Sequence, residues 1–199
     1  MLGAVNPPTF TVSEGELYQY GAMGTIIHHM AEMALKGDDN PTNLYAECKE
    51  EWALVQEGSL KLKPSAANPR GFMDKYQNEF EWDYPSRAIE VEMFDDELML
   101  SGTADLVTNY NGKLAICDWK TCRSFSAEKK EHYFKQLALY SIMYERLYGK
   151  KIYGLCILPL NPKNKAGYGR PICSDELLKY QELALKDLET FGKLYNHNQ

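Results

Sequence analysis

The stretch that decides the fold is Ser101-Gly-Thr-Ala-Asp-Leu-Val-Thr-Asn-Tyr-Asn-Gly-Lys-Leu-Ala-Ile-Cys-Asp-Trp-Lys120. It reads as two β-strands joined at Asn111-Gly112, a dipeptide strongly favoured in two-residue hairpin turns. With such a turn Tyr110 faces Lys113, and this pair sets the register of every residue farther along the two strands. The stretch therefore predicts one antiparallel hairpin of known register.

Counting outward along that hairpin places Asp105 directly opposite Asp118. Like charges facing each other on neighbouring strands are destabilising, so a folded protein needs a positive charge nearby. Lys120 projects from the same face as Asp118, because side chains in a strand repeat with a period of two. Carboxylates are the ligands that Mg²⁺ and Mn²⁺ prefer, and a metal so held can activate water and offset the charge of a phosphate. The alternative is a surface hairpin in which Asp118 pairs with Lys120 or caps a turn.

The rest of the chain predicts an α/β domain with a central mixed sheet and helices on its faces. Helices are expected first, followed by a three-stranded meander, a long crossover helix, a fourth strand and a last helix. The expected helices span 13–37, 43–57, about 72–80, 127–148 and 174–195, and the expected strands span 88–94, 98–108, 113–120 and 152–158. Residues 1–12 contain prolines and are expected to be irregular.

Composition is that of an ordinary globular protein, with 44% hydrophobic and 25% charged residues among 199 and a formal net charge of −6. The chain shows no apolar run that could span a membrane and no signal peptide, so a cytoplasmic location is expected. The five cysteines lack any C-x-x-C spacing, which favours free thiols in a reducing compartment over disulfides or a cysteine-held metal. The negative net charge argues against a protein that coats nucleic acid, but local lysine clusters such as the one from Lys129 to Lys135 leave a nucleic-acid enzyme open.

Two acidic residues precede the hairpin, in the first predicted strand. If that strand turns into the next over two residues, Glu90 faces Ser101 or Thr103. Glu90 and Glu92 would then lie on the same sheet face as Asp105, with Glu90 the nearer. The alternative for both is an exposed position on an edge strand.

Three further residues lie on predicted helices. His28 follows Gly24, which lies one turn earlier on the same face and would allow close approach of another backbone. A single histidine on a helix is more often a surface or core residue than a metal ligand. Gln136 and Tyr140 are spaced i, i+4 on the crossover helix and so share a face. The alternative for this pair is the polar boundary of a core stripe.

Several enzyme classes are disfavoured because their motifs are missing from the sequence. There is no phosphate-binding G-x-x-x-x-G-K-[ST] loop and no G-x-G-x-x-G after a strand. There is also no G-x-S-x-G elbow and no H-E-x-x-H.

Taken in order, five short motifs resemble the PD-(D/E)XK nuclease superfamily in its RecB-like exonuclease branch. They are GTIIH (24–28), Glu90, GTAD (102–105), ICDWKT (116–121) and Q-x-x-x-Y (136–140). The segment from Gly112 to Thr121 looks most like mitochondrial genome-maintenance exonucleases and their bacterial and phage relatives. The resemblance implies a restriction-endonuclease-like core at about 88–160 within a single nuclease domain, with a helical part at about 13–80 and a C-terminal helix.

The same resemblance implies site roles. Asp105 and Asp118 would be catalytic metal ligands for one or two Mg²⁺ or Mn²⁺ ions, joined by His28 and the backbone carbonyl of Trp119. Lys120 would act at the nucleophile or the scissile phosphate, and Glu90 matches the upstream acidic residue. The residues expected to contact the active site or the DNA strand are Gln136, Tyr140, Thr121 and Lys135.

The resemblance further implies a hydrolase that acts on single-stranded or end-bearing duplex DNA in replication, recombination or repair, as a homo-oligomer or with a recombination partner. No iron–sulfur cluster is expected, because the cysteine set of the cluster-bearing relatives is missing. Two other classes stay open: an inactive nucleic-acid-binding module on the same fold, and a metal-dependent phosphoesterase acting on small substrates.

Overall fold

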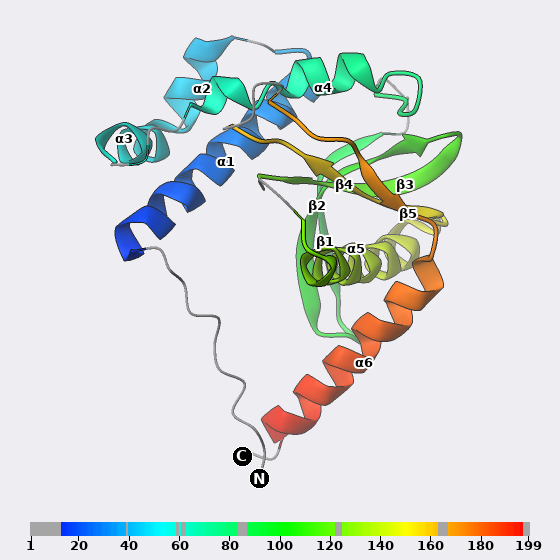
Figure 1. The fold of residues 1–199 in the computed structure, drawn as a ribbon. Coiled ribbons are helices and arrows are strands. Elements are labelled where there is room, and N and C mark those ends of the chain that lie inside the picture. Colours follow the sequence, from blue (N-terminus) through cyan, green and yellow to red (C-terminus); the bar gives the residue numbers. More distant parts are fainter. Residues whose placement is uncertain are drawn as a thin grey trace.

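The computed structural model describes residues 13–38, 40–58, 60, 63–82, 87–121, 125–162 and 167–196. Five strands form one mixed sheet in the order β1-β2-β3-β4-β5 (Figure 1). The elements are α1 (Glu14–Lys36), α2 (Pro41–Glu47), α3 (Lys49–Glu57), α4 (Pro69–Lys75), β1 (Ala88–Asp95), β2 (Leu100–Tyr110), β3 (Lys113–Lys120), α5 (Ala127–Tyr148), β4 (Gly154–Pro159), β5 (Ile172–Ser174) and α6 (Leu177–Asn196), with a short 3₁₀ turn at Pro64–Ala66.

The sheet is an antiparallel meander followed by a crossover. β1, β2 and β3 pair antiparallel, and α5 then carries the chain to β4, which pairs parallel with β3. A parallel neighbour needs such a long connection, and the helix supplies it. The mixed α/β architecture expected from the sequence is confirmed.

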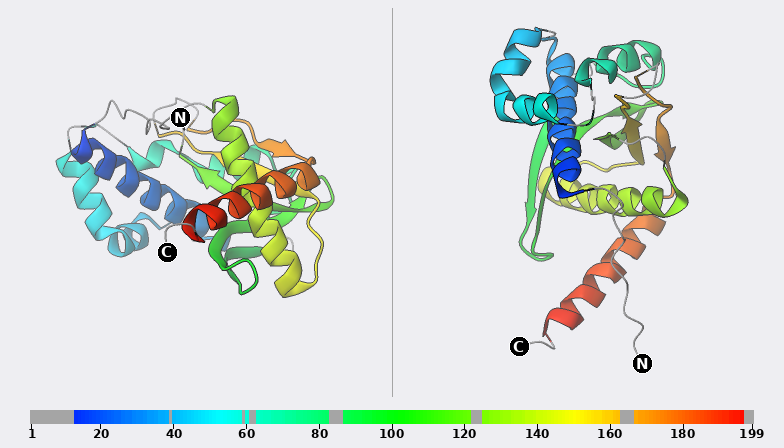
Figure 2. Two further views of the ribbon diagram at one scale, coloured as in Figure 1. Left: turned by 90° about the horizontal axis from the view of Figure 1, so that it is seen from below. Right: turned by 60° about the vertical axis from the view of Figure 1, so that its left-hand side comes forward.

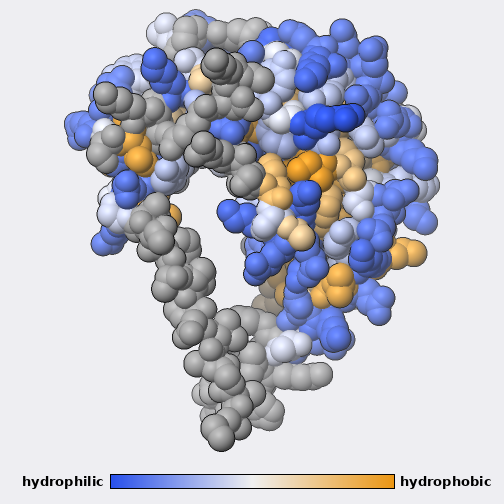
Figure 3. All heavy atoms as spheres, viewed as in Figure 1, coloured by the Kyte–Doolittle hydropathy of each residue, from blue (hydrophilic) through white to orange (hydrophobic). Residues whose placement is uncertain are grey.

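Helices cover the sheet on both faces, so the core lies in two clusters. On one face α1 and α4 pack against Leu106, Cys117 and Trp119. On the other face α5 packs against Val107 and Ile116. Figure 2 shows the α1–α4 group and the α5–α6 pair as separate layers, with α6 extending away from the sheet. The face drawn in Figure 3 is mostly hydrophilic, with hydrophobic residues near its centre and in a few smaller separate areas.

The two long helices have the end signals that the sequence suggested. α1 begins at a capping box in which Ser13 and Glu16 bond each other's backbone N–H groups. Ser126 caps α5, and Gly149 ends it in the left-handed conformation. These end groups satisfy backbone donors and acceptors that a helix otherwise leaves unpaired.

Some predicted boundaries are wrong. The helix expected at 43–57 is two helices that meet at Cys48, whose backbone leaves the helical conformation. The helix expected at 72–80 lies at 69–75 because Asn68 caps it and Pro69 starts it. β5 was not expected: its pairing with β4 keeps Cys173 and Ser174 extended, so the last helix begins at Leu177.

The cysteine expectation also needs correction. Cys156 and Cys173 are directly opposite each other on β4 and β5 and form a disulfide, with their Cα atoms 4.2 Å apart. Two antiparallel strands can bring cysteines together that are 17 residues apart in the sequence, a pairing that spacing alone does not reveal. Cys48 and Cys117 are free and buried, and Cys122 lies outside the described residues. Among the described helices, none is both long and apolar enough to cross a membrane.

Candidate active site

The candidate site lies where β2 separates from β3. In the described residues the ladder between these strands runs from the Tyr110–Lys113 pair to the Leu106–Cys117 pair, in the register predicted from the Asn-Gly turn. Beyond it the outer half of β2 pairs with β1, and the end of β3 pairs with β4. We call this separation the fork. Asp105 and Asp118 are the first residues beyond the last pair, one on each side of the fork.

The alternation of side chains breaks at the fork. Leu106 packs on the α1 side, whereas Ala104, two residues away, packs on the α5 side. β1 changes in the same way between Ile89 and Val91, and Glu90 between them has a positive φ of 50°. A local bend in both strands therefore turns the outer β1–β2 hairpin toward α5 and leaves Asp105 at the bend. A non-glycine residue in this conformation is uncommon and often marks a functional site.

Asp105 links three elements. One of its carboxylate oxygens, Oδ2, accepts a 2.7 Å hydrogen bond from the backbone N–H of Trp119 across the fork. The same oxygen lies 3.3 Å from Nδ1 of His28 on α1. Burial works to lower the pKa of His28, but the hydrogen bond and charge of Asp105, with the charge of Asp118, raise it above its ordinary value. The structure thus brings His28 to the two aspartates.

Asp118 is buried and carries Lys120 beside it. Burial, followed by the charge of Asp105, raises the pKa of Asp118 to about 6, against the opposing effect of Lys120. Nζ of Lys120 lies 2.5 Å from Oδ2 of Asp118. This short contact is a close ion pair at a buried carboxylate.

Gln136 and Tyr140 extend the site along α5. Oε1 of Gln136 lies 3.4 Å from Nζ of Lys120, and its Nε2 donates a 3.0 Å hydrogen bond to the Tyr140 hydroxyl. The Tyr140 ring lies against Gly102 of β2, where an added Cβ would come within 2.5 Å of the ring. Both members of the Q-x-x-x-Y motif therefore lie in one chain of contacts that ends at Lys120.

Glu90 lies at the fork, although not where its register was expected. The prediction that it faces Ser101 or Thr103 is wrong, because the β1–β2 turn is longer than two residues and Asp95 pairs with Leu100. Glu92 is the residue that faces Thr103. Glu90 is instead level with Asp105. Desolvation, followed by the charges of Asp105 and Glu32, raises the pKa of Glu90 to about 7.

Two other expected residues differ in their placement. Thr121 follows β3 and lies near α1, since a Cβ added to Gly24 would be 3.6 Å from Oγ1 of Thr121. That is an ordinary van der Waals contact with a side chain, so within the described ranges no backbone makes the expected close approach to Gly24. Lys135 points toward α6, where it pairs with Asp187 at 2.7 Å. The structure does not bring Lys135 together with the other site residues.

Trp119 separates the polar side of the fork from the aromatic core. Its indole packs edge-on against Phe72 and stacked with Trp82, with ring centroids 5.3 and 6.3 Å away. Its Nε1 is buried without a hydrogen-bond partner among the described residues. The ring therefore anchors β3 on the α4 side, while the backbone of the same residue bonds Asp105.

Sequence reasoning missed Tyr133 and the role of Gly102. The Tyr133 ring centroid is 4.8 Å from Nζ of Lys120. Tyr133 has the spacing of an apolar residue on its helix, and only the position of β3 shows that a cation covers its ring. Gly102 was noted as part of GTAD, but the contact with Tyr140 is long-range and leaves no local signal.

The donor set suits a hard divalent cation that keeps part of its water. No three His, Cys, Asp or Glu side chains in the described ranges form a group able to hold a metal by themselves. Mg²⁺, however, typically binds through one or two carboxylates, water and substrate phosphate rather than a closed protein cage. Asp105 and Asp118 supply two such carboxylates, and the charge of each disfavours the charge of the other until a cation is bound. His28 and the backbone of Trp119 lie next to them.

The comparisons with known proteins agree with this geometry. The model of the PD-(D/E)XK nuclease superfamily matches residues 3–197. No curated protein matches the sequence. Among solved structures, a protein from Eubacterium rectale that is named provisionally as an exonuclease has 16% sequence identity and a TM-score of 0.53. The alignment covers 84% of this chain and 64% of that protein, and at this identity it shows a shared fold alone. By the match over nearly its whole length, the chain belongs to the PD-(D/E)XK nuclease superfamily.

Proposed function

We propose that this protein is a divalent-metal-dependent deoxyribonuclease, and specifically an exonuclease that hydrolyses phosphodiester bonds of DNA. The observation that carries the proposal is the convergence of Asp105, Asp118 and Lys120 at the fork, with His28 bonded to Asp105 from α1. Buried carboxylates with a cation beside them are rarely idle, since each charge is unfavourable without a partner. Family membership supports the nuclease class.

The proposed ligands of Mg²⁺ or Mn²⁺ are Asp105, Asp118 and the Trp119 carbonyl, with His28 as a ligand or as the group that orients Asp105. When bound, such an ion lowers the pKa of water and offsets the negative charge of a phosphate. Water adds to phosphorus, the bond to the leaving oxygen breaks, and that oxygen takes up a proton.

The side chains of this protein have separate tasks in that reaction. The ammonium of Lys120 is placed to orient the water or to stabilise the extra charge on the phosphate oxygens. Gln136 and Tyr140 hold Lys120 from the α5 side, through the contacts at 3.4 and 3.0 Å. Glu90 adds a third acidic group whose raised pKa suits proton transfer near neutral pH.

The exonuclease assignment rests on the resemblance of the five motifs to RecB-like exonucleases. It implies a role in DNA replication, recombination or repair, on single-stranded DNA or duplex ends. A steep fall of DNA affinity with salt is expected, because phosphate contacts release counterions. A phosphoesterase for small substrates would lack that salt dependence.

The test uses labelled DNA in four forms: single- and double-stranded, each linear with an end label and circular with an internal label. Each form is incubated with Mg²⁺, Mn²⁺ or a chelator. The proposal predicts degradation of linear DNA with either metal, none of circular DNA, and none with the chelator. Cleavage of circular DNA would contradict exonuclease action, and intact DNA in every condition would contradict the nuclease proposal itself.

A further inference from the structure

Among the described residues, three side chains have a recorded contact with the ammonium of Lys120, and only two of them belong to the recognised motifs. Asp118 pairs with it at 2.5 Å, and Gln136 lies at the long distance of 3.4 Å. The third neighbour is the face of the Tyr133 ring, 4.8 Å from Nζ. On the α5 side the only polar contact among the described residues, with Gln136, is long for a hydrogen bond, so the ring has a share in holding the ammonium there.

We propose that Tyr133 is a positioning residue that holds the ammonium of Lys120 at the fork, an inference that rests on the proposed nuclease function. A cation over an aromatic face is attracted by the quadrupole of the ring, and the attraction grows as water is removed. The side chain of Lys120 is 18% exposed, so its cation is largely desolvated.

The ring has a particular advantage over the two polar neighbours. Asp118 is a proposed metal ligand, and a carboxylate that shares its charge with a metal attracts Lys120 less. Gln136 divides its amide between Lys120 and the Tyr140 hydroxyl. The Tyr133 ring is uncharged and is not a proposed metal ligand, so a metal held by Asp118 would not compete with Lys120 for its face.

Tyr133 is itself held in place by the surrounding structure. It sits on α5 three residues before Gln136, so both face the same side of the helix. Its ring meets Phe125 edge-on at 6.1 Å, and one side of it packs against the α5 core cluster. A ring supported in this way supplies a fixed surface for a flexible lysine side chain.

The first test needs no catalysis and uses the metal-free protein. An aromatic face shifts the NMR signals of protons above it upfield, so the ε-methylene protons of Lys120 should resonate upfield of the other lysines in ¹³C-lysine-labelled protein. Lys120→Arg assigns the signal by removing it. Tyr133→Phe should keep the shift and Tyr133→Leu should abolish it. An unshifted Lys120 signal in the wild-type protein would overturn the proposal even if Tyr133→Leu fails to fold.

The second test is kinetic. Tyr133→Leu should lower kcat by about 2- to 30-fold, the range expected from the strength of a cation–π contact. KM should stay unchanged, because the ring acts through Lys120 and not on the DNA. Tyr133→Phe should restore the wild-type kcat. Wild-type kcat in Tyr133→Leu, or loss of kcat in Tyr133→Phe, would contradict the positioning role.

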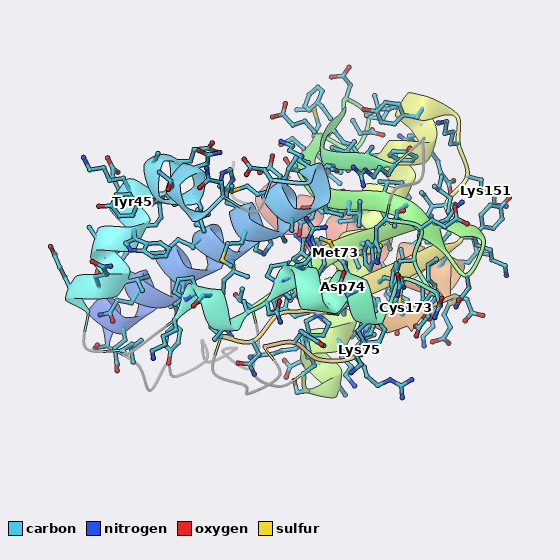
Figure 4. The ribbon with its side chains drawn as sticks, turned by 90° about the horizontal axis from the view of Figure 1, so that it is seen from above. Tyr45, Met73, Asp74, Lys75, Lys151 and Cys173 are labelled. Atoms are coloured by element: carbon cyan, nitrogen blue, oxygen red, sulfur yellow. A yellow bond between two sulfur atoms is a disulfide. The ribbon has the colours of Figure 1, made fainter. Side chains whose placement is uncertain are left out.

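A matched control lies far from the fork. Nζ of Lys151 lies 5.7 Å from the centroid of the Tyr153 ring. This pair directly precedes β4, at the end of the sheet away from Asp118. In Figure 4, Lys151 lies at the opposite edge of the molecule from Tyr45 of α2. Tyr153→Leu removes the same kind of pair and should leave kcat unchanged. If the wild-type protein cleaves no DNA, the proposed function fails, while the NMR test still decides whether Tyr133 holds Lys120.

Discussion

The carboxylate of Asp105 accepts a 2.7 Å hydrogen bond from the backbone N–H of Trp119, across the fork where β2 leaves β3. This bond ties the two strands together at the point where their ladder ends. It also holds the Asp105 side chain beside Asp118. The catalytic proposal depends on this joining of the two strands.

Asp118→Asn should affect stability and activity in opposite directions. The raised pKa of Asp118 means that its charge is unfavourable in the folded protein even with Lys120 beside it. A neutral amide relieves this penalty, so the free energy of unfolding of the metal-free protein should rise by about 1–3 kcal/mol. DNA cleavage should be lost, because an amide is a poor ligand for Mg²⁺. Denaturant titration and a cleavage assay on the same sample check both results, and a less stable variant would contradict the electrostatic account.

The neighbouring histidines of α1 should behave differently when replaced. His28→Gln removes the imidazole partner of Asp105. Mn²⁺ affinity and the cleavage rate should both fall at least about 10-fold, because losing a group that orients a metal ligand typically has an effect of that size. His29→Gln instead breaks contacts with Glu32 and with Glu47 of α2. It should lower the melting temperature slightly and leave cleavage unchanged. Equal cleavage by the two variants would contradict the assignment of His28 to the site.

Gly102→Ala should lower activity through Tyr140. The added Cβ would overlap the Tyr140 ring, which must then move and pull its hydrogen-bonded partner Gln136 away from Lys120. We expect kcat to fall at least about 10-fold, the effect of losing about 1.4 kcal/mol of transition-state stabilisation. Gly21→Ala is the matched control, since none of the described residues lies within 4 Å of the added Cβ on α1. That variant should keep full activity and gain stability, because alanine favours a helix.

The β1–β2 hairpin gives a prediction of pH dependence away from the catalytic residues. The Asp95 carboxylate accepts a hydrogen bond from the backbone N–H of Leu98 and pairs with Arg146 of α5. Both interactions lower the pKa of Asp95, and the hydrogen bond from Leu98 has the larger effect. A carboxyl with a lowered folded-state pKa stabilises the protein above its ordinary pKa and loses this effect as the pH falls through the folded-state value. Asp95→Asn should therefore be less stable than the wild type at about pH 7, and the difference should shrink as the pH falls through the folded-state pKa of Asp95. A stability difference that does not change with pH would contradict this.

Much of the fold could be predicted from local signals. The Asn111-Gly112 turn fixed the β2–β3 register, because a two-residue hairpin allows one pairing. Ser126 and Gly149 marked the ends of α5 for equally local reasons. The β1–β2 register could not be counted in the same way, because its turn is longer and lacks a diagnostic dipeptide.

The candidate site was predictable only in part, because some of its contacts join segments that are far apart in the sequence. The acidic residues and Lys120 lie close together in sequence, so strand periodicity could relate them. The bend at Glu90 and Asp105, the Tyr133 face over Lys120 and the Cys156–Cys173 disulfide depend on packing between distant segments. Such contacts are set by the assembled core and not by any local pattern.

The central claim is that Asp118 and Lys120 act together at a metal-dependent nuclease site. The most direct measurement is the initial rate of nucleotide release from end-labelled linear single-stranded DNA with Mg²⁺, for wild type, Asp118→Asn, Lys120→Ala and the Gly21→Ala control. The account predicts release by the wild type and Gly21→Ala, and none by the two site variants, all four being folded. Equal rates in Asp118→Asn and the wild type, with Mg²⁺ present, would contradict it.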